Sequence, residues 1–141
     1  MSKQNFHASC VAIGEFGLLI RGASGSGKSD LVLRLLDEAR GVSLVSDDQV
    51  LLVEHQGALM ATAPASLAGK LEIRGQGIMP WPYIAQVKLS HIVDLVEPAE
   101  ISRMPEVREL QTSLMNHVFP CLKLAAKQAS APARIRAFLQ R

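Results

Sequence analysis

Short apolar runs, broken by glycine and by charged residues, dominate the first half of the chain. Residues 8–13 and 17–20 are almost wholly apolar and short, which is typical of buried strands. Residues 30–39 instead place leucine and valine at helical spacing and end at Arg40-Gly41. This segment is therefore predicted to form an amphipathic helix. A third apolar run, residues 42–46, predicts another strand directly after it.

The next segments favour more strands. Residues 50–54 and 59–62 flank His55-Gln56-Gly57-Ala58, which predicts a hairpin with glycine in its turn. Residues 71–79 alternate apolar and charged positions and then contain two glycines, which predicts a strand running into a tight loop that approaches a ligand. A later strand is expected at either 85–89 or 92–96, and the alanine-rich residues 125–133 are expected to form helix or loop. The pattern as a whole predicts an α/β fold.

Composition limits the architecture to one domain. The chain has 141 residues, of which 48% are hydrophobic and 20% charged, so residues 1–141 are expected to form a single domain with a real core. Cys10 and Cys121 show no metal-binding spacing, which predicts reduced, packed thiols and a cytoplasmic protein. No apolar run approaches the length of a membrane span, so no membrane partner is expected.

The basic residues gather toward the C-terminal end. Residues 99–141 carry seven Lys and Arg against three Asp and Glu, although the net charge is only +2. Two interpretations stay open: a docking region for an acidic or phosphorylated partner, or a solvated helical face. The basic residues form no dense cluster, and no nucleic-acid partner is expected.

One segment carries a strong chemical signal. Gly22-Ala23-Ser24-Gly25-Ser26-Gly27-Lys28-Ser29 matches the phosphate-loop pattern G-x-x-x-x-G-K-[ST]. In such a loop, backbone N–H groups and a helix N-terminus surround the phosphates of a nucleoside triphosphate. The Lys28 ammonium can follow charge onto the transferring phosphoryl group, and the Ser29 hydroxyl can bind magnesium. An accidental glycine-rich and serine-rich turn is the alternative, but the predicted strand and helix flank the loop in register.

Two adjacent acids follow the predicted strand at 42–46. Asp47 and Asp48 stand where phosphate-loop proteins place a carboxylate that handles magnesium or water. Because successive strand side chains alternate in direction, only one of the two is expected to face the phosphates. Asp47 is the candidate general base for a hydroxyl nucleophile, and Asp48 is assigned to the magnesium site. A pair of turn-capping residues is the alternative.

Together, the 22–29 segment, the two acids and Leu71-Glu72-Ile73-Arg74-Gly75-Gln76-Gly77-Ile78 resemble the catalytic domain of HPr kinase/phosphorylase. The resemblance extends from about residue 7 to residue 124. It implies a P-loop kinase domain with a mixed, β-rich sheet and few helices, in a short form made of the catalytic domain alone. It also implies ATP and Mg²⁺ as cofactors, an HPr-type phosphocarrier phosphorylated on serine as partner, and hexamers.

The resemblance further implies residue roles. Lys28 binds phosphate, Ser29 and Glu72 hold magnesium, and Asp47 accepts a proton during phosphorylation and donates one during dephosphorylation. His7 stands fifteen residues before Gly22, the spacing of a histidine in the family. Arg103, within residues 101–104, resembles the family's arginine in a loop after a later strand. His7, Lys28, Asp47 and Arg103 are thus the implied catalytic set.

Residues 125–130 depart from the family's valine, glycine and arginine pattern, so the resemblance implies kinase activity more directly than phosphorylase activity. Two other functions stay open. A small-metabolite kinase would share the phosphate loop and Asp47 but enclose its substrate in a pocket. A nucleotide-sensing regulator without catalysis would use Asp47 and Glu72 only for folding or ligand sensing.

Overall fold

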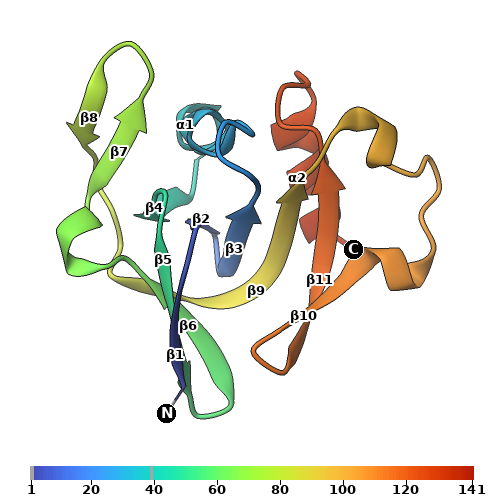
Figure 1. Cartoon of the computed structure of the whole chain (residues 1–141), viewed down its shortest axis with the longest axis horizontal. Helices are drawn as coiled ribbons and strands as arrows, with labels where there is room; N and C mark the ends of the chain where they lie inside the picture. The colour runs from blue at the N-terminus through green and yellow to red at the C-terminus, as the bar shows by residue number, and fades with distance from the viewer. Residues whose placement is uncertain (1, 39) are drawn as a thin grey trace.

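A mixed β-sheet is the largest feature of the computed structural model, which describes residues 2–38 and 40–141 (Figure 1). These residues form a nine-stranded sheet with the path β1-β5-β6-β9-β3-β2-β4, to which β11 adds beside β9 and β10 beside β11. The strands are β1 (Lys3–Phe6), β2 (Ala8–Ile13), β3 (Phe16–Arg21), β4 (Val42–Ser46), β5 (Val50–His55), β6 (Ala58–Thr62), β9 (Gln86–Leu95), β10 (Gln111–Leu114) and β11 (His117–Leu124). Two α-helices accompany them in the described part of the chain, α1 (Lys28–Glu38) and α2 (Ala131–Leu139). The expected β-rich, mixed α/β fold with few helices is confirmed.

Four strands end along one edge of the sheet. Strand β3 pairs in parallel with β9, which pairs in parallel with β11, whereas β2 is antiparallel to both β3 and β4. Strands β4, β3, β9 and β11 therefore all point the same way, and we call the edge where they end the carboxyl edge. Ligands of open α/β sheets bind outside this edge.

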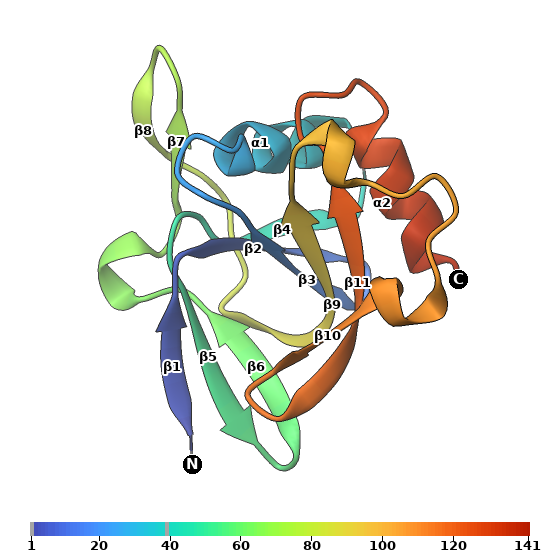
Figure 2. The ribbon, with the colours of Figure 1, turned by 45° about the vertical axis from the view of Figure 1, so that its right-hand side comes forward.

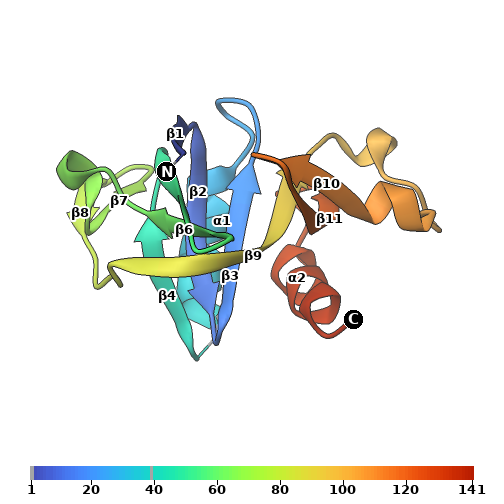
Figure 3. The same ribbon diagram turned by 90° about the horizontal axis from the view of Figure 1, so that it is seen from below.

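Strand β9 joins the two halves of the sheet. Its first residues pair antiparallel with β6, and its later residues pair in parallel with β3 and β11, as Figure 3 shows from below. The sequence pattern predicted a strand at either 85–89 or 92–96, and the structure joins both ranges into one strand. The polar Ser90 interrupts the apolar pattern but continues the strand, because its hydroxyl accepts a hydrogen bond from the Gly17 backbone N–H at 3.0 Å.

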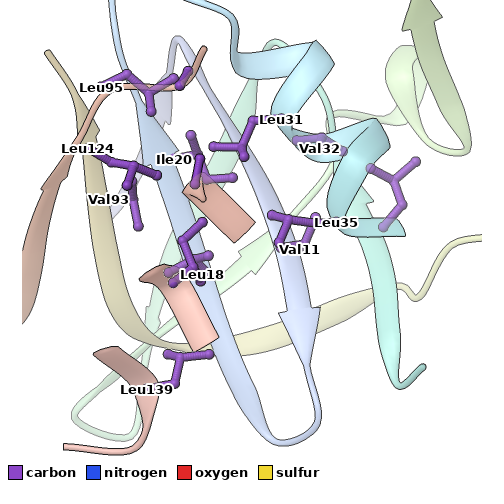
Figure 4. Packing of buried hydrophobic residues seen from close by; sticks show 14 of the residues in the cluster. Val11, Leu18, Ile20, Leu31, Val32, Leu35, Val93, Leu95, Leu124 and Leu139 are labelled. Atoms are coloured by element: carbon purple, nitrogen blue, oxygen red, sulfur yellow. The ribbon is translucent and has the colours of Figure 1, made fainter. Parts of the chain in front are cut away.

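Two hydrophobic clusters lie on opposite faces of β2 and β3. Helices α1 and α2 cover one face, and β1, β5 and β6 lie on the other (Figure 2). In β3, Leu18 and Ile20 point into the cluster beneath the helices, where Leu31 and Leu35 of α1 meet them (Figure 4). Leu19, between them, joins the second cluster. Strand β3 is therefore buried on both faces. This packing holds the start of the loop at residues 22–29 in place.

A small hairpin stands beside α1. It consists of β7 (Lys70–Ile73) and β8 (Gly77–Pro80), where the sequence predicted one strand and a tight loop. Gly75 and Gly77 have φ of +88° and +90°, a conformation that favours glycine, so the predicted loop is the turn of this hairpin. Leu71 is fully buried in the cluster under α1 and anchors the hairpin, whereas Ile78 is 67% exposed.

The remaining predictions agree with the structure to varying degrees. The strands at 8–13 and 42–46 are confirmed to the residue, and β3, β5 and β6 each extend one residue or two beyond the predicted range. Helix α1 begins at Lys28, two residues earlier than predicted, and residue 39 of the predicted helix lies outside the described residues. The alanine-rich segment divides into a loop and the start of α2. Strands β1 and β10 were not predicted.

Short 3-10 helices occupy several connections. They are η1 (Ala65–Leu67), η2 (Pro98–Glu100) and η3 (Val107–Leu110). Helix η2 directly follows β9, and this places it at the carboxyl edge.

Candidate functional site

The loop at residues 22–29 connects β3 to α1 at the carboxyl edge, as the motif requires. Gly25 and Gly27 have φ of +80° and +98°, so the left-handed turns that curl this loop depend on glycine. A Cβ added to Gly27 would stand 3.2 Å from the Cβ of Ala126, in the loop between β11 and α2. The two loops are therefore packed directly against each other.

Lys28 lies across its own loop. Its side chain is buried, and its ammonium donates hydrogen bonds to the carbonyl oxygens of Gly22 at 2.7 Å and Ala23 at 3.1 Å. Desolvation lowers the pKa of Lys28 below its ordinary value, while the negative charges of Asp48 and Asp47 act in the opposite direction. The ammonium is thus held beside the loop backbone and near two acids.

Asp47 is the centre of a hydrogen-bonded group. It is only 3% exposed, directly after β4. The Ser29 hydroxyl lies 2.9 Å from both carboxylate oxygens, and the Ser9 hydroxyl donates to Oδ1 at 2.8 Å. The backbone N–H of Glu72 donates to Oδ2 at 3.2 Å. Strands β2, β4 and β7 and the start of α1 therefore all position this one carboxylate.

Asp48 points elsewhere, as predicted, but the cause is a turn and not strand alternation, because both acids lie beyond the end of β4. Its side chain is 55% exposed, and its φ of +73° turns the chain sharply after Asp47. The Oδ1 atom lies 3.8 Å from Nε2 of His7, which is itself 52% exposed. The contact of His7 with the site is therefore with Asp48 and not with Asp47.

Glu72 and Arg103 are placed less closely. The Glu72 side chain is exposed, and its contact with Asp47 comes from the backbone. Arg103 lies in the exposed segment after η2, and within residues 2–38 and 40–141 its guanidinium forms no ion pair. The structure therefore joins Ser29 to Asp47 directly, holds the Lys28 ammonium against its own loop, and leaves the side chains of Glu72 and Arg103 outside the hydrogen-bonded group.

The oxygen atoms near Ser29 suit a magnesium ion. The Ser29 hydroxyl and the Asp47 carboxylate are hard oxygen donors in contact with each other, and Mg²⁺ prefers such donors together with water and phosphate oxygens. The exposed carboxylate of Asp48, the next residue in the chain, is a donor of the same kind. Among the described residues, no group of three or more His, Cys, Asp and Glu side chains forms a metal cluster. A site of this kind would need oxygen atoms of a bound phosphate to be complete.

A cavity of about 580 Å³ opens on the side of the loop away from Asp47. It is lined by residues 23–26, by residues 95–98 with Glu100 after β9, and by residues 125–128 after β11. Beneath it, Arg21 and Asp94 join β3 to β9 through a two-point ion pair with N–O distances of 2.7 and 2.9 Å. The thiol of Cys121 in β11 also donates to Asp94 at 3.4 Å.

Sequence reasoning missed two residues that hold this region together. Ser9 is a fully buried polar residue in an apolar strand, and this mismatch was its only signal. Arg34, on α1, donates to the backbone carbonyls of Ala126 and Gln128 and so ties the β11–α2 loop to the helix. A surface position in an amphipathic helix gave no signal for that contact.

Within residues 2–38 and 40–141, no helix is long and apolar enough to cross a membrane.

Comparison with known proteins matches both the sequence and the fold. The family model described as HPr Serine kinase C-terminal domain matches residues 1–116. A protein named HPr kinase/phosphorylase from Clostridium novyi (strain NT) is 39% identical over 97 residues, 64% of this chain and 31% of that protein. One of the same name from Clostridium tetani (strain Massachusetts / E88) is 39% identical over 89 residues, 63% of this chain and 28% of that protein. The match thus spans less than a third of the length of these relatives.

A solved structure shares the fold. The structure titled "Structure of the Hpr(Ser) kinase/phosphatase from Coxiella burnetii" matches with a TM-score of 0.83 at 24% identity, over 97% of this chain and 88% of the other. At this identity the likeness describes the fold alone. The family model, which covers most of the chain, decides the membership: the chain belongs to the HPr serine kinase C-terminal domain family.

Proposed function

We propose that this chain transfers the γ-phosphoryl group of ATP to a serine of an HPr-type phosphocarrier protein. The observation that carries the proposal is the contact between Ser29, the last residue of the phosphate loop, and the buried carboxylate of Asp47. It joins a nucleotide-binding motif to a fixed acid at the carboxyl edge. Family membership supports the same reaction.

The loop and Lys28 are assigned to ATP. Backbone N–H groups of residues 22–29 and the N-terminus of α1 favour negative charge at this position. The Lys28 ammonium, now bonded to Gly22 and Ala23, would exchange these carbonyls for phosphate oxygens. Ser29 and Asp48 would hold Mg²⁺, with Glu72 as the third proposed ligand. The metal supplies charge neutralisation on the phosphate oxygens.

Asp47 is assigned to the proton. The attacking serine hydroxyl forms its bond to the γ-phosphorus as the bond to the ADP oxygen breaks, and the hydroxyl proton passes to the Asp47 carboxylate. In the reverse sense, inorganic phosphate attacks the phosphoserine phosphorus, pyrophosphate forms, and Asp47 returns a proton to the departing serine oxygen. One carboxylate serves both directions.

Arg103 and His7 complete the proposed catalytic set. An arginine beside the transferring group offsets charge that builds up in the transition state. Arg103 lies in an exposed segment, so this role requires the segment to approach the acceptor side of Asp47 when the substrates bind. His7 would act through Asp48, which it faces at 3.8 Å.

A protein acceptor fits the shape of the site better than a small metabolite. The cavity of about 580 Å³ lies on the other side of the phosphate loop, and Asp47 does not line it. Beside Asp47 stands the β7–β8 hairpin, which exposes Ile78 to 67%. The second cavity, of about 300 Å³, also lies away from Asp47, so neither of these two cavities encloses the proposed general base as a small-metabolite kinase would require.

The test is phosphoryl transfer measured by intact mass. The purified chain is incubated with Mg²⁺, ATP and an HPr-type phosphocarrier, and one phosphate is expected on a serine of the carrier. Asp47→Asn should abolish transfer while MgATP still binds. Asp37→Asn, an exposed acid on α1, is the matched control and should transfer like the natural chain.

Tight MgATP binding without transfer to the carrier would refute the proposal. This result would favour the nucleotide-sensing regulator. If free serine or another metabolite gained the phosphate, it would favour a small-molecule kinase. Homo-oligomers and a cytoplasmic location are proposed with the family, and light scattering of the purified chain tests the hexamer.

A further inference from the structure

The cavity beside the phosphate loop has no role in the reaction proposed above. We propose that it binds the nucleoside of the nucleotide whose phosphates occupy the 22–29 loop, with the ribose hydroxyls beside Glu97 and Glu100 and the base edge beside Gln128. The inference rests on the proposed function, because it presumes that the loop binds a triphosphate. The volume of the cavity, about 580 Å³, falls within the usual range for small-molecule sites.

The order of the strands sets the direction of the ligand. Along the sheet, β3 and its loop lie between β2 and β4 on one side and β9 and β11 on the other. Asp47 follows β4, and the cavity walls follow β9 and β11, so the acid and the cavity lie on opposite sides of the loop. A triphosphate bound along the loop with its γ-phosphate near Asp47 directs its other end toward the cavity.

The charges in the cavity indicate which end of the ligand enters it. Glu97 and Glu100 belong to the wall after β9, Lys127 belongs to the wall after β11, and none of the three forms an ion pair within the described part of the chain. The two carboxylates outnumber the one ammonium, so the net negative charge of the cavity disfavours phosphates and acidic peptides, whereas carboxylates accept hydrogen bonds from the hydroxyls of an uncharged sugar. An acid in this role toward ribose is known in dinucleotide-binding folds.

Two residues that line the cavity carry unsatisfied polar atoms. Within residues 2–38 and 40–141, the buried side-chain oxygens without a hydrogen-bond partner are Oγ of Ser26, in the phosphate loop, and Oε1 of Gln128, in the loop between β11 and α2. Leaving such an atom unpaired costs about 1–3 kcal/mol. Both atoms are buried, so a ligand gains this energy when the side chain turns toward the cavity and pairs with it. The Gln128 amide also has both a donor and an acceptor, which suits the edge of a base.

The wall that carries Gln128 is held in place before any ligand binds. Arg34 of α1 donates to the carbonyls of Ala126 and Gln128, and Ala126 packs on Gly27 of the phosphate loop. The phosphate loop and this wall are therefore positioned by the same helix. Such preorganisation lowers the entropic cost of binding.

Calorimetric titration of the full chain tests the inference with three magnesium-loaded probes: ATP, 2′,3′-dideoxy-ATP and tripolyphosphate. We expect ATP to bind about tenfold or more tightly than tripolyphosphate, and about three- to tenfold more tightly than the dideoxy analogue. The double variant Glu97→Gln with Glu100→Gln should bind ATP and the dideoxy analogue about equally. Because both ligands carry the same charge, their ratio cancels the general effect of removing two acids.

Gln128→Ala should reduce ATP affinity about three- to tenfold and leave tripolyphosphate affinity unchanged, which also shows that the variant is folded. Glu15→Gln, in the exposed β2–β3 turn at the opposite edge of the sheet, should change neither. Equal affinity for ATP and tripolyphosphate, or ATP binding by both variants like the natural chain, overturns the inference. If serine transfer persists in that case, the proposed function stands, whereas loss of all binding to all three probes refutes both.

Discussion

The hydroxyl of Ser9, buried in β2, donates a hydrogen bond of 2.8 Å to Oδ1 of Asp47 and accepts one of 3.2 Å from the backbone N–H of Asp48. Ser9 thus fixes both the carboxylate and the turn that carries it. This contact comes from β2, which precedes the phosphate loop in the sequence. Ser9 is a positioning residue for the proposed general base.

Ser9→Ala should therefore slow transfer more than it weakens binding. We expect kcat to fall about tenfold with KM for ATP nearly unchanged, because one hydrogen bond to a charged group is lost.

Steady-state kinetics measure kcat and KM separately, and Ser9→Thr, which keeps the hydroxyl, should restore kcat. A lower unfolding temperature with an unchanged kcat would show instead that Ser9 only stabilises the fold.

Arg34→Lys should loosen the wall of the cavity. A lysine cannot reproduce the guanidinium contacts with two carbonyls, so residues 125–128 should exchange amide hydrogens faster. Hydrogen exchange followed by mass spectrometry measures this locally. Arg136→Lys, exposed on α2, is the matched control. Unchanged exchange in Arg34→Lys would mean that packing of Ala126 on Gly27 alone holds the loop.

His91 should make stability depend on pH. It lies half-buried between Phe16 and Phe138, and desolvation lowers its pKa below the ordinary 6.5. The unfolded chain therefore binds more protons below pH 6.5, and the free energy of unfolding should fall as the pH drops from 6.5 toward the pKa of folded His91.

Urea unfolding at several pH values from 5 to 8 measures this slope. His91→Gln should flatten it, whereas His55→Gln, at the exposed end of β5, should not. An equal slope in His91→Gln and the natural chain would assign the pH dependence to other groups.

Both thiols should be inert in the folded protein. Cys10 and Cys121 are free and buried, and desolvation, aided at Cys121 by the Asp94 carboxylate, raises each pKa to about 12. The thiolate is the reactive form, so iodoacetamide at pH 8 should label neither residue without denaturant and both in urea. Mass spectrometry counts the labels. Rapid labelling of native Cys121 would mean that the β9–β11 pairing opens readily.

The sequence predicted the part of the site that is built from neighbouring segments of the chain. The phosphate loop, its flanking strand and helix, and Asp47 after β4 are local patterns with known spacing, and the structure joins Ser29 to Asp47 by hydrogen bonds. Only one of the two acids meets Ser29, as expected, but the left-handed turn at Asp48 separates them, because both acids lie beyond the end of β4.

Contacts between distant segments could not be predicted in the same way. Ser9 reaches Asp47 only because β2 pairs with β4, and Ala126 reaches the phosphate loop only because β11 pairs with β9. The polar Ser90 and His91 divided β9 in the sequence pattern, since nothing local indicated that Ser90 would bond to Gly17. The exposed Arg103 keeps the role that resemblance implies, and that role stays a prediction.

The pairing of β3 with β9 has a consequence for synthesis on the ribosome. The phosphate loop emerges before the segments that complete its site: the strand beside it is about seventy residues later, and the cavity wall after β11 is about a hundred residues later. A nascent chain therefore exposes an apolar β3 edge until residue 95 has emerged. Nucleotide can stabilise this domain only once nearly all of it has been translated, so early folding must proceed without help from the ligand.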